Sequence, residues 1–105
     1  MCGNRGILPG HLRDSMVVER FKNGDPEPVY KRFREQGRMA PDGLTYISSW
    51  VDEKMQICFQ VMEANDRALI DLWISHWDDL VDFEVFRVMT SAEAAARASR
   101  ETTTT

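Results

Sequence analysis

Residues 44–63 read LTYISSWVDEKMQICFQVME. Apolar and polar side chains alternate over 44–51 and again over 55–63, and this period of two residues is typical of a β-strand. Only a short polar turn, residues 52–54, separates the two runs. Strands joined by so short a turn pair as an antiparallel hairpin, so the sequence predicts a hairpin in the middle of the chain.

Three further elements are predicted on the C-terminal side of this hairpin. Asn65 is placed to cap a helix over residues 66–77. The broad apolar stripe of this helix consists of Leu69, Ile70, Trp73, Ile74 and Trp77. A last strand is predicted over 81–89, and the spacing of Thr90 and Glu93 indicates a capping box for a terminal helix over 91–99.

The chain before the hairpin predicts one strand and one helix. SMVVERF, residues 15–21, alternates as a strand should. Asp25 and Pro26 favour the start of a helix over 26–36, and Gly37 is placed to end it in a left-handed conformation. Residues 1–14 carry three Gly and a Pro without any period, which indicates a flexible arm.

The predicted order is therefore strand, helix, strand, strand, helix, strand, followed by an extra C-terminal helix. This is the α+β ferredoxin-like arrangement, with a four-stranded antiparallel sheet and two helices on one face. A chain of 105 residues is long enough for one core. We expect a single domain over 15–98, after the flexible arm 1–14 and before a disordered tail over 99–105.

The charge balance argues against nucleic acid as a partner. Thirteen Lys and Arg against seventeen Asp and Glu give a formal net charge of −4, which leaves no positive field for a phosphate backbone. The basic residues that do cluster are Lys31, Arg32, Arg34 and Arg38. Such a run is typical of a solvated helix face, and otherwise of a small patch for an anion or a partner.

The cysteines and the hydropathy pattern indicate a cytoplasmic protein. Cys2 and Cys58 are too few and too scattered for a disulfide framework. No run of about 18 apolar residues is present, and the first residues do not resemble a signal peptide. We therefore expect neither secretion nor a membrane span.

Alternation also assigns the strand residues to two faces of the sheet. We expect the face that packs on the helices to carry Val18, Ile47, Val51, Ile57, Phe59, Val61, Phe83 and Val85. The opposite face would carry Val17, Glu19, Phe21, Tyr46, Ser48, Trp50, Cys58, Gln60, Met62, Glu84, Phe86 and Val88. A monomer would not expose so many large apolar groups, so the sequence predicts a homodimer whose sheets close a barrel or sandwich.

The composition of the same face also favours a second interpretation, in which it forms a pocket for a small apolar or aromatic molecule. Tyr46 and Trp50 could stack on a planar ligand, while Ser48 or Gln60 could orient it by hydrogen bonds. Two further residues of this face, Cys58 and Phe86, would complete the ligand-binding set, although no cation near Cys58 favours a thiolate nucleophile. A filled dimer interface and an open pocket both remain compatible with the pattern.

Glu19 and Glu84 are the most suggestive catalytic pair. The first and last strands are neighbours in this topology, so we expect the two carboxylates to lie close together. Two such groups in a low-dielectric site cannot both ionise easily, and one would then have a raised pKa suited to a general acid or base. Ion pairs with Arg20, Arg87 or a partner subunit are the structural alternative.

His76 is the third catalytic candidate, because imidazole titrates near neutral pH. Its place at a helix end also suits a structural hydrogen bond to a terminal carbonyl. His11, His76, Cys2 and Cys58 lack the paired spacing of a zinc site, so no metal is expected. No dinucleotide, Walker or nucleophile-elbow motif occurs, so the sequence predicts no cofactor.

Several motifs resemble those of a family of short bacterial proteins known only as a domain of unknown function. The likeness covers about residues 16–97 and is most specific at ERFK, GRMAP-x-GL, SSWVDEK and DLVDFEV. Where the family often has a proline after the last of these motifs, this chain has Arg87. The resemblance implies a fold similar to dimeric α/β-barrel proteins, which include cofactor-free monooxygenases, lactone isomerases and stress-response proteins, but it carries over no catalytic motif.

Together these observations predict a homodimer that binds a small molecule between the sheet and the helices. Cofactor-independent chemistry of the monooxygenase or isomerase type would use Glu19, Glu84 or His76. The alternative is a non-catalytic dimeric interaction or stress-response protein.

Overall fold

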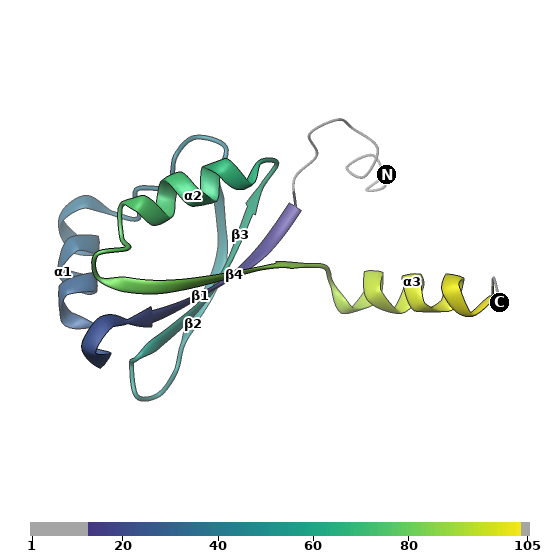
Figure 1. The fold of residues 1–105 in the computed structure, drawn as a ribbon, viewed down its shortest axis with the longest axis horizontal. Coiled ribbons are helices and arrows are strands. Elements are labelled where there is room, and N and C mark those ends of the chain that lie inside the picture. The colour runs from purple at the N-terminus through teal and green to yellow at the C-terminus, as the bar shows by residue number, and fades with distance from the viewer. Residues whose placement is uncertain (1–12, 104–105) are drawn as a thin grey trace.

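The computed structural model describes residues 13–103, with side chains up to Ser99. Of the arm expected over 1–14, residues 1–12 lie outside the described residues, and so do residues 104–105 of the expected tail. The elements in chain order are β1 (Arg13–Phe21), a 3₁₀ turn (Lys22–Gly24), α1 (Glu27–Gln36), β2 (Thr45–Val51), β3 (Ile57–Ala64), α2 (Arg67–Ser75), β4 (Val81–Val88) and α3 (Ser91–Thr103) (Figure 1).

The four strands form one sheet with the order β2-β3-β1-β4, and every neighbouring pair is antiparallel. The α+β class, the four-stranded antiparallel sheet and the three helices predicted from the sequence are therefore confirmed. Among the described helices, none is long and apolar enough to cross a membrane.

Local side-chain caps fix the ends of the helices. The Asp25 carboxylate accepts a hydrogen bond of 3.0 Å from the backbone N–H of Glu27, in the first turn of α1. Gly37 ends this helix with a φ of 72°, a left-handed value that glycine adopts without steric cost. Asp66, and not Asn65 as predicted, caps α2, because its carboxylate accepts the backbone N–H of Ala68 at 2.9 Å.

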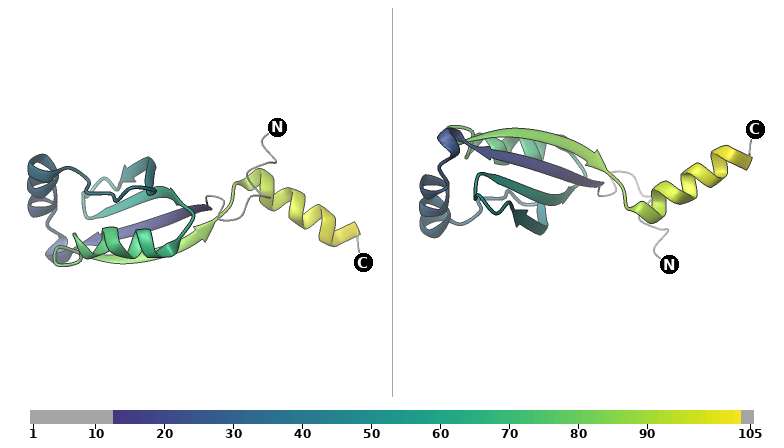
Figure 2. Two further views of the ribbon diagram at one scale, coloured as in Figure 1. Left: turned by 90° about the horizontal axis from the view of Figure 1, so that it is seen from above. Right: turned by 90° about the horizontal axis from the view of Figure 1, so that it is seen from below.

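The capping box predicted for α3 is present. The backbone N–H of Glu93 donates to the Thr90 hydroxyl and that of Thr90 donates to the Glu93 carboxylate, both at 3.0 Å. The helix projects away from the sheet in every view (Figures 1 and 2), and its residues 91–99 are exposed. It extends to Thr103, beyond the expected end at 99.

Strand register shows which face of the sheet packs on the helices. Val17 and Met62 are fully buried and belong to one core cluster with Ile70, Trp73 and Trp77 of the α2 region. Since directly paired residues point to the same side, the inner face carries Val17, Glu19 and Phe21 of β1, Cys58, Gln60 and Met62 of β3, and Val81, Phe83 and Val85 of β4.

The predicted assignment of faces was therefore wrong for β1 and β3 and right for Phe83 and Val85 of β4. Period two correctly grouped the residues of β1, β3 and β4, but it does not say which group meets the helices. The wholly apolar group was predicted to form the core, whereas the inner face includes the polar Glu19 and Gln60. The outer face instead carries Val18, Ile57, Phe59, Val61, Trp50, Phe86 and Val88.

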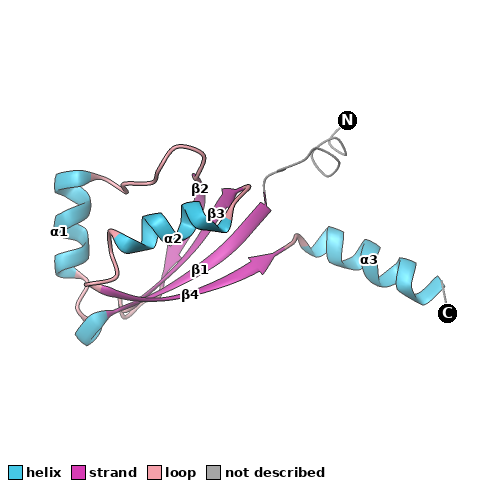
Figure 3. Cartoon of the chain, turned by 45° about the horizontal axis from the view of Figure 1, so that its top comes forward, coloured by secondary structure: helices cyan, strands magenta, loops and turns pink. Residues whose placement is uncertain are grey.

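The two helices that accompany the sheet lie differently on it. α2 lies along the sheet, whereas α1 lies past its end (Figures 1 and 3). No residue of α1 is buried, and its Val29 and Tyr30 are only half-buried. The inner face near this end of the sheet is therefore incompletely covered.

β2, at one edge of the sheet, contains an irregularity. Tyr46 pairs with Met62 and Ser48 with Val61, so one extra residue is inserted between the two pairs. As a result Tyr46 and Ser49 share the inner side with Met62 and Gln60, while Ser48 and Trp50 lie on the outer side.

Candidate functional site

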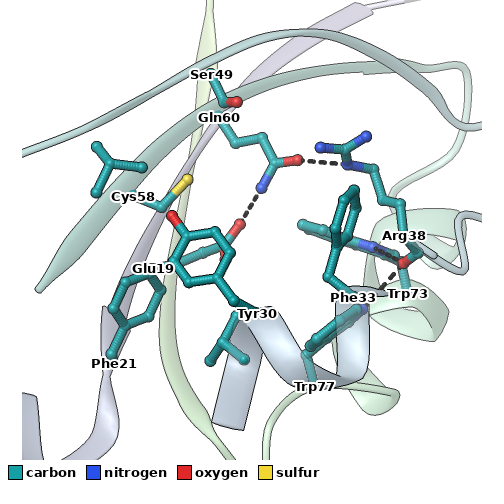
Figure 4. A pocket seen from close by; sticks show the side chains of 12 residues that line it. Glu19, Phe21, Tyr30, Phe33, Arg38, Ser49, Cys58, Gln60, Trp73 and Trp77 are labelled. Carbon is teal, nitrogen blue, oxygen red and sulfur yellow. Dashed lines mark hydrogen bonds between the residues drawn. The ribbon is translucent and has the colours of Figure 1, made fainter. Parts of the chain in front are cut away.

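A pocket of about 130 Å³ lies between the inner face of the sheet and the two helices (Figure 4). It forms where α1 leaves the sheet uncovered. Its lining residues are Glu19, Phe21, Val29, Tyr30, Phe33, Arg38, Ser49, Val51, Cys58, Gln60, Trp73 and Trp77. An apolar cavity of about 150 Å³ holds a benzene molecule, so this pocket has the size for one small ring.

Glu19 is the acidic group of the pocket. Its place on β1, between Val17 and Phe21 on the inner face, buries it to 7% exposure. Burial raises the pKa of its carboxyl to about 7, against opposing contributions from a hydrogen bond with Gln60 and the positive charge of Arg38. Glu19 can therefore both accept and donate a proton near neutral pH.

Gln60 connects Glu19 to Arg38. Its side-chain N–H donates to the Glu19 carboxylate, and its carbonyl oxygen accepts a hydrogen bond of 3.0 Å from Nε of Arg38. Both bonds are drawn in Figure 4. Because Gln60 is only 4% exposed, this polar chain crosses the inner face of the sheet in a largely dry environment.

Arg38 is positioned by its backbone as well as by its side chain. The indole N–H groups of Trp73 and Trp77 both donate to the carbonyl oxygen of Arg38, each at 3.0 Å. Its guanidinium carbon lies 3.7 Å from the ring centroid of Tyr46 and 5.2 Å from that of Phe33. These are cation–π contacts, and they fix the plane of the guanidinium at the pocket.

Two further titratable groups of the pocket, Cys58 and Tyr30, stay neutral. Burial is the main cause that raises the pKa of the Cys58 thiol to about 12, and the nearby Glu19 adds to the rise. Burial also raises the pKa of Tyr30 above its ordinary value. Between mildly acidic and mildly basic pH, Glu19 is therefore the pocket group that changes charge.

The predicted pairing of Glu19 with Glu84 was wrong. The register places Glu19 opposite Phe83 and Val18 opposite Glu84, so the two carboxylates project from opposite faces of the sheet. Glu84 is exposed and forms an ion pair with Arg20 on the outer face, which is one of the structural alternatives expected for it.

His76 lies outside the pocket, at the C-terminal cap of α2, with an exposed side chain. Its backbone carbonyl accepts a hydrogen bond of 2.9 Å from Arg32. The same guanidinium binds both carboxylate oxygens of Asp79. The contacts of His76 thus connect α1 to the end of α2.

The six predicted ligand-binding residues divide between the two faces. Cys58 and Gln60 line the pocket, and Tyr46 borders it through its contact with Arg38. Ser48, Trp50 and Phe86 lie on the outer face, where Trp50 is 58% and Phe86 51% exposed. The structure therefore brings Glu19, Cys58 and Gln60 together and separates them from Glu84, Trp50 and Phe86.

Of the lining residues, the sequence predicted Glu19, Cys58 and Gln60 as site residues. It did not place the others at the pocket, among them Tyr30, Phe33, Arg38, Trp73 and Trp77. Trp73 and Trp77 were interpreted as part of the apolar stripe of a packed helix, and both do belong to the core cluster. Arg38 was included in a basic cluster with an anion patch as its minor interpretation. The signal that separates it from the others is Gly37, which ends α1 and places Arg38 beyond the helix.

Within residues 13–103, no three His, Cys, Asp or Glu side chains gather as metal ligands. The polar side-chain groups around the pocket include one carboxyl, one thiol, one amide, hydroxyl groups and a guanidinium. This set suits proton transfer and hydrogen bonding to a small organic molecule.

Residues 16–101 match a family model described as Domain of unknown function (DUF3303). The match includes α1, α2 and all of β2, β3 and β4, together with most of β1. The expected resemblance to a domain of unknown function is thus confirmed. The chain has no match among curated proteins or among solved structures.

Proposed function

This chain belongs to the DUF3303 family, and from its pocket we propose that it binds a small planar molecule between the sheet and its helices and transfers a proton to or from it. We further propose that the domain is ferredoxin-like and works as a homodimer of the α/β-barrel type. The βαββαβ order of elements and the strand order β2-β3-β1-β4 support the fold assignment.

The observation that carries the proposal is the environment of Glu19. A carboxyl that is 7% exposed, has a pKa of about 7 and lies on a pocket wall is matched to acid–base work at neutral pH. The aromatic side chains around it favour a flat, largely apolar ligand. A structural carboxylate would need no adjoining space, whereas Glu19 adjoins a pocket of about 130 Å³.

The chemistry that this arrangement supports needs no cofactor. Ionised Glu19 would take a proton from a carbon or hydroxyl of the ligand, and the resulting neutral acid would return it at another atom, as in an isomerisation. If the deprotonated ligand instead met molecular oxygen, the same first step would begin a cofactor-free oxygenation. In both reactions Gln60 keeps the carboxylate oriented through its hydrogen bond.

The pocket is tested by the binding of small aromatic probes, which is measured from the changes in backbone amide NMR shifts. In the variant Cys58→Phe a ring would fill the pocket, so wild-type protein should bind phenol or benzamide and this variant should not. Leu72→Phe is the matched control, because it adds the same ring at a half-exposed position of α2 that does not line the pocket. Equal binding by all three proteins, or by none, would contradict the proposed site.

The homodimer proposal is supported by the outer face. Its large side chains Trp50, Phe59 and Phe86 are 58%, 37% and 51% exposed, and Val61 and Val88 lie among them. A second copy would cover this continuous apolar surface. Such a dimer without chemistry would be an interaction or stress-response protein, which is the second candidate function.

Native mass spectrometry of protein purified without added ligand addresses both candidates. A dimer with additional bound mass would support a small-molecule-binding homodimer and identify its occupant. A bare dimer in which Glu19→Gln also leaves probe binding and stability unchanged would favour the interaction protein. A monomer would contradict the use of the outer face for dimerisation.

A further inference from the structure

Arg38 is the most firmly positioned charged side chain at the pocket. Two indole N–H groups hold its backbone carbonyl, Gln60 accepts from its Nε, and the rings of Tyr46 and Phe33 pack against its guanidinium. An arginine held in one orientation loses little rotamer entropy when it binds a ligand. A hydrogen bond to Gln60 alone would not require Arg38 to be held by so many contacts.

The terminal edge of this guanidinium remains available. Across residues 13–103, no protein group accepts a hydrogen bond from Nη1 or Nη2 of Arg38, and the side chain lines the pocket. Within the part of the chain that the structure describes, the guanidinium donates one hydrogen bond, from Nε to Gln60, and this bond does not use the edge formed by Nη1 and Nη2. The pair of Nη groups can therefore bind a further acceptor, and a carboxylate fits such an edge with two parallel hydrogen bonds.

The charges of the pocket favour an anion. Among the described lining residues, Arg38 is the one cation and Glu19 the one carboxylic acid. With Glu19 protonated, the pocket carries the positive charge of Arg38 without a compensating negative group. The remaining walls are largely aromatic and apolar, which suits a planar carboxylate rather than a doubly charged phosphate that would need more cations.

We propose that Arg38 is the anion-binding residue of this pocket and that the ligand is a small planar carboxylic acid, its ring or double bond held among the aromatic side chains. This inference rests on the proposed function, because it uses the same pocket, and it adds the class of ligand. In this arrangement the carboxylate binds Arg38 while the apolar part of the ligand extends towards Glu19 and Cys58.

The experiment compares benzoate with benzamide, which share a planar ring and nearly the same size but differ in charge. Both are titrated by NMR into wild-type protein, Arg38→Gln and Arg34→Gln. Arg34 is a control because it is an exposed arginine of the same helix region and does not line the pocket. We expect Arg38→Gln to weaken benzoate binding by about tenfold or more and benzamide binding by less than about threefold.

The remaining outcomes separate the two proposals. If wild-type protein binds both probes and Arg38→Gln binds both as well as wild type does, the role of Arg38 is wrong while the pocket stands. If both probes weaken equally in Arg38→Gln, Arg38 only shapes the pocket and the anion assignment is again overturned. If neither probe binds wild-type protein, the proposed function itself fails. Arg38→Lys, which keeps the charge but not the fork, should bind benzoate with intermediate affinity.

Discussion

Arg38 fixes the direction in which the amide of Gln60 points. The Nε–H of Arg38 requires an acceptor, so the carbonyl oxygen of Gln60 faces it at 3.0 Å and the amide N–H faces Glu19. Because Arg38 donates to the carbonyl oxygen of Gln60, the amide N–H of Gln60 is the group that faces Glu19. This donor stabilises the ionised form of Glu19 and limits the rise of its pKa caused by burial.

The first prediction concerns this donor. Gln60→Met keeps the side-chain size and removes the hydrogen bond, so the pKa of Glu19 should rise by about one unit above its value of about 7. The pKa of Glu19 is measured from the NMR shift of its carboxyl carbon in a pH titration. Gln36→Met, at an exposed position of α1, should leave the titration of Glu19 unchanged. A lower pKa in Gln60→Met would show that Gln60 favours the protonated acid.

The second prediction is a pH dependence of stability. The pKa of Glu19 rises from 4.5 to about 7 on folding, so the folded state holds the proton more tightly between these values. The contribution is fully present below about pH 4.5 and is lost as pH rises through about 7, with a total of about 3 kcal/mol. Urea unfolding of wild-type protein and Glu19→Gln at about pH 4 and about pH 8 measures the difference.

In that experiment the free energy of unfolding of Glu19→Gln should decrease less with pH than that of wild-type protein. Glu53→Gln, at an exposed turn position, should keep the wild-type dependence. Parallel pH profiles for wild type and Glu19→Gln would show that Glu19 titrates normally in the folded state.

The third prediction joins Glu19 to the proposed anion site. Ionised Glu19 neutralises the charge of Arg38, so benzoate binding should weaken above about pH 7, by up to about tenfold per pH unit. Cys58 and Tyr30 also face this site, and both have raised pKa values that keep them neutral over this range. Isothermal titration at a series of pH values measures the effect, and Glu19→Gln should abolish it. An unchanged slope in that variant would assign the titration to another group.

The fourth prediction concerns the indole that holds Arg38. Trp77→Phe removes one of two N–H donors to the Arg38 carbonyl and leaves space in the core, because Trp77 is 5% exposed. It should lower the free energy of unfolding by about 2 kcal/mol. Urea unfolding measures it. Leu72→Ala shortens a side chain of α2 that is 50% exposed and should stay within about 0.5 kcal/mol of wild type. A free energy of unfolding that is unchanged in Trp77→Phe would show that the indole of Trp77 does not stabilise the fold.

The fifth prediction tests the outer face as a dimer interface. Trp50→Glu places a charge within that apolar surface, on the edge strand β2 beside Phe59, and should raise the dimer dissociation constant by about thirtyfold or more. Sedimentation equilibrium over a range of concentrations measures it. Leu72→Glu is the control, since Leu72 is 50% exposed on α2 and lies away from the sheet face. An equal effect in both variants would remove the outer face from the proposal.

Local sequence signals predicted the elements well. Asp25, Gly37 and the pair Thr90 and Glu93 act at the helix ends as expected, because capping depends on a few neighbouring residues. Both Asn65 and Asp66 have side chains that can cap a helix. Asp66 is the cap because the helix begins at Arg67. The pairing of β2 with β3 also followed, because a short turn restricts the partners of the two strands that it joins.

The site was predicted less well, for a physical reason. The alternation of apolar and polar residues did not show that the face containing Glu19 and Gln60 meets the helices. Inner faces are usually apolar, and this one carries a buried polar pair because a pocket lies there. The inserted residue between Tyr46 and Ser48 also changes the phase of β2, and no local pattern marks it. Arg38 acquires its role from Trp73 and Trp77, which are distant in sequence.

The inserted residue in β2 has one more consequence, for polymerisation. An edge strand offers unpaired backbone groups on which another chain can extend the sheet, and that growth is the route to fibrils. A bulge between Tyr46 and Ser48 breaks the straight ladder that such an incoming strand would need. The local distortion that turns Ser49 towards the pocket thus also protects the β2 edge of the sheet from uncontrolled assembly.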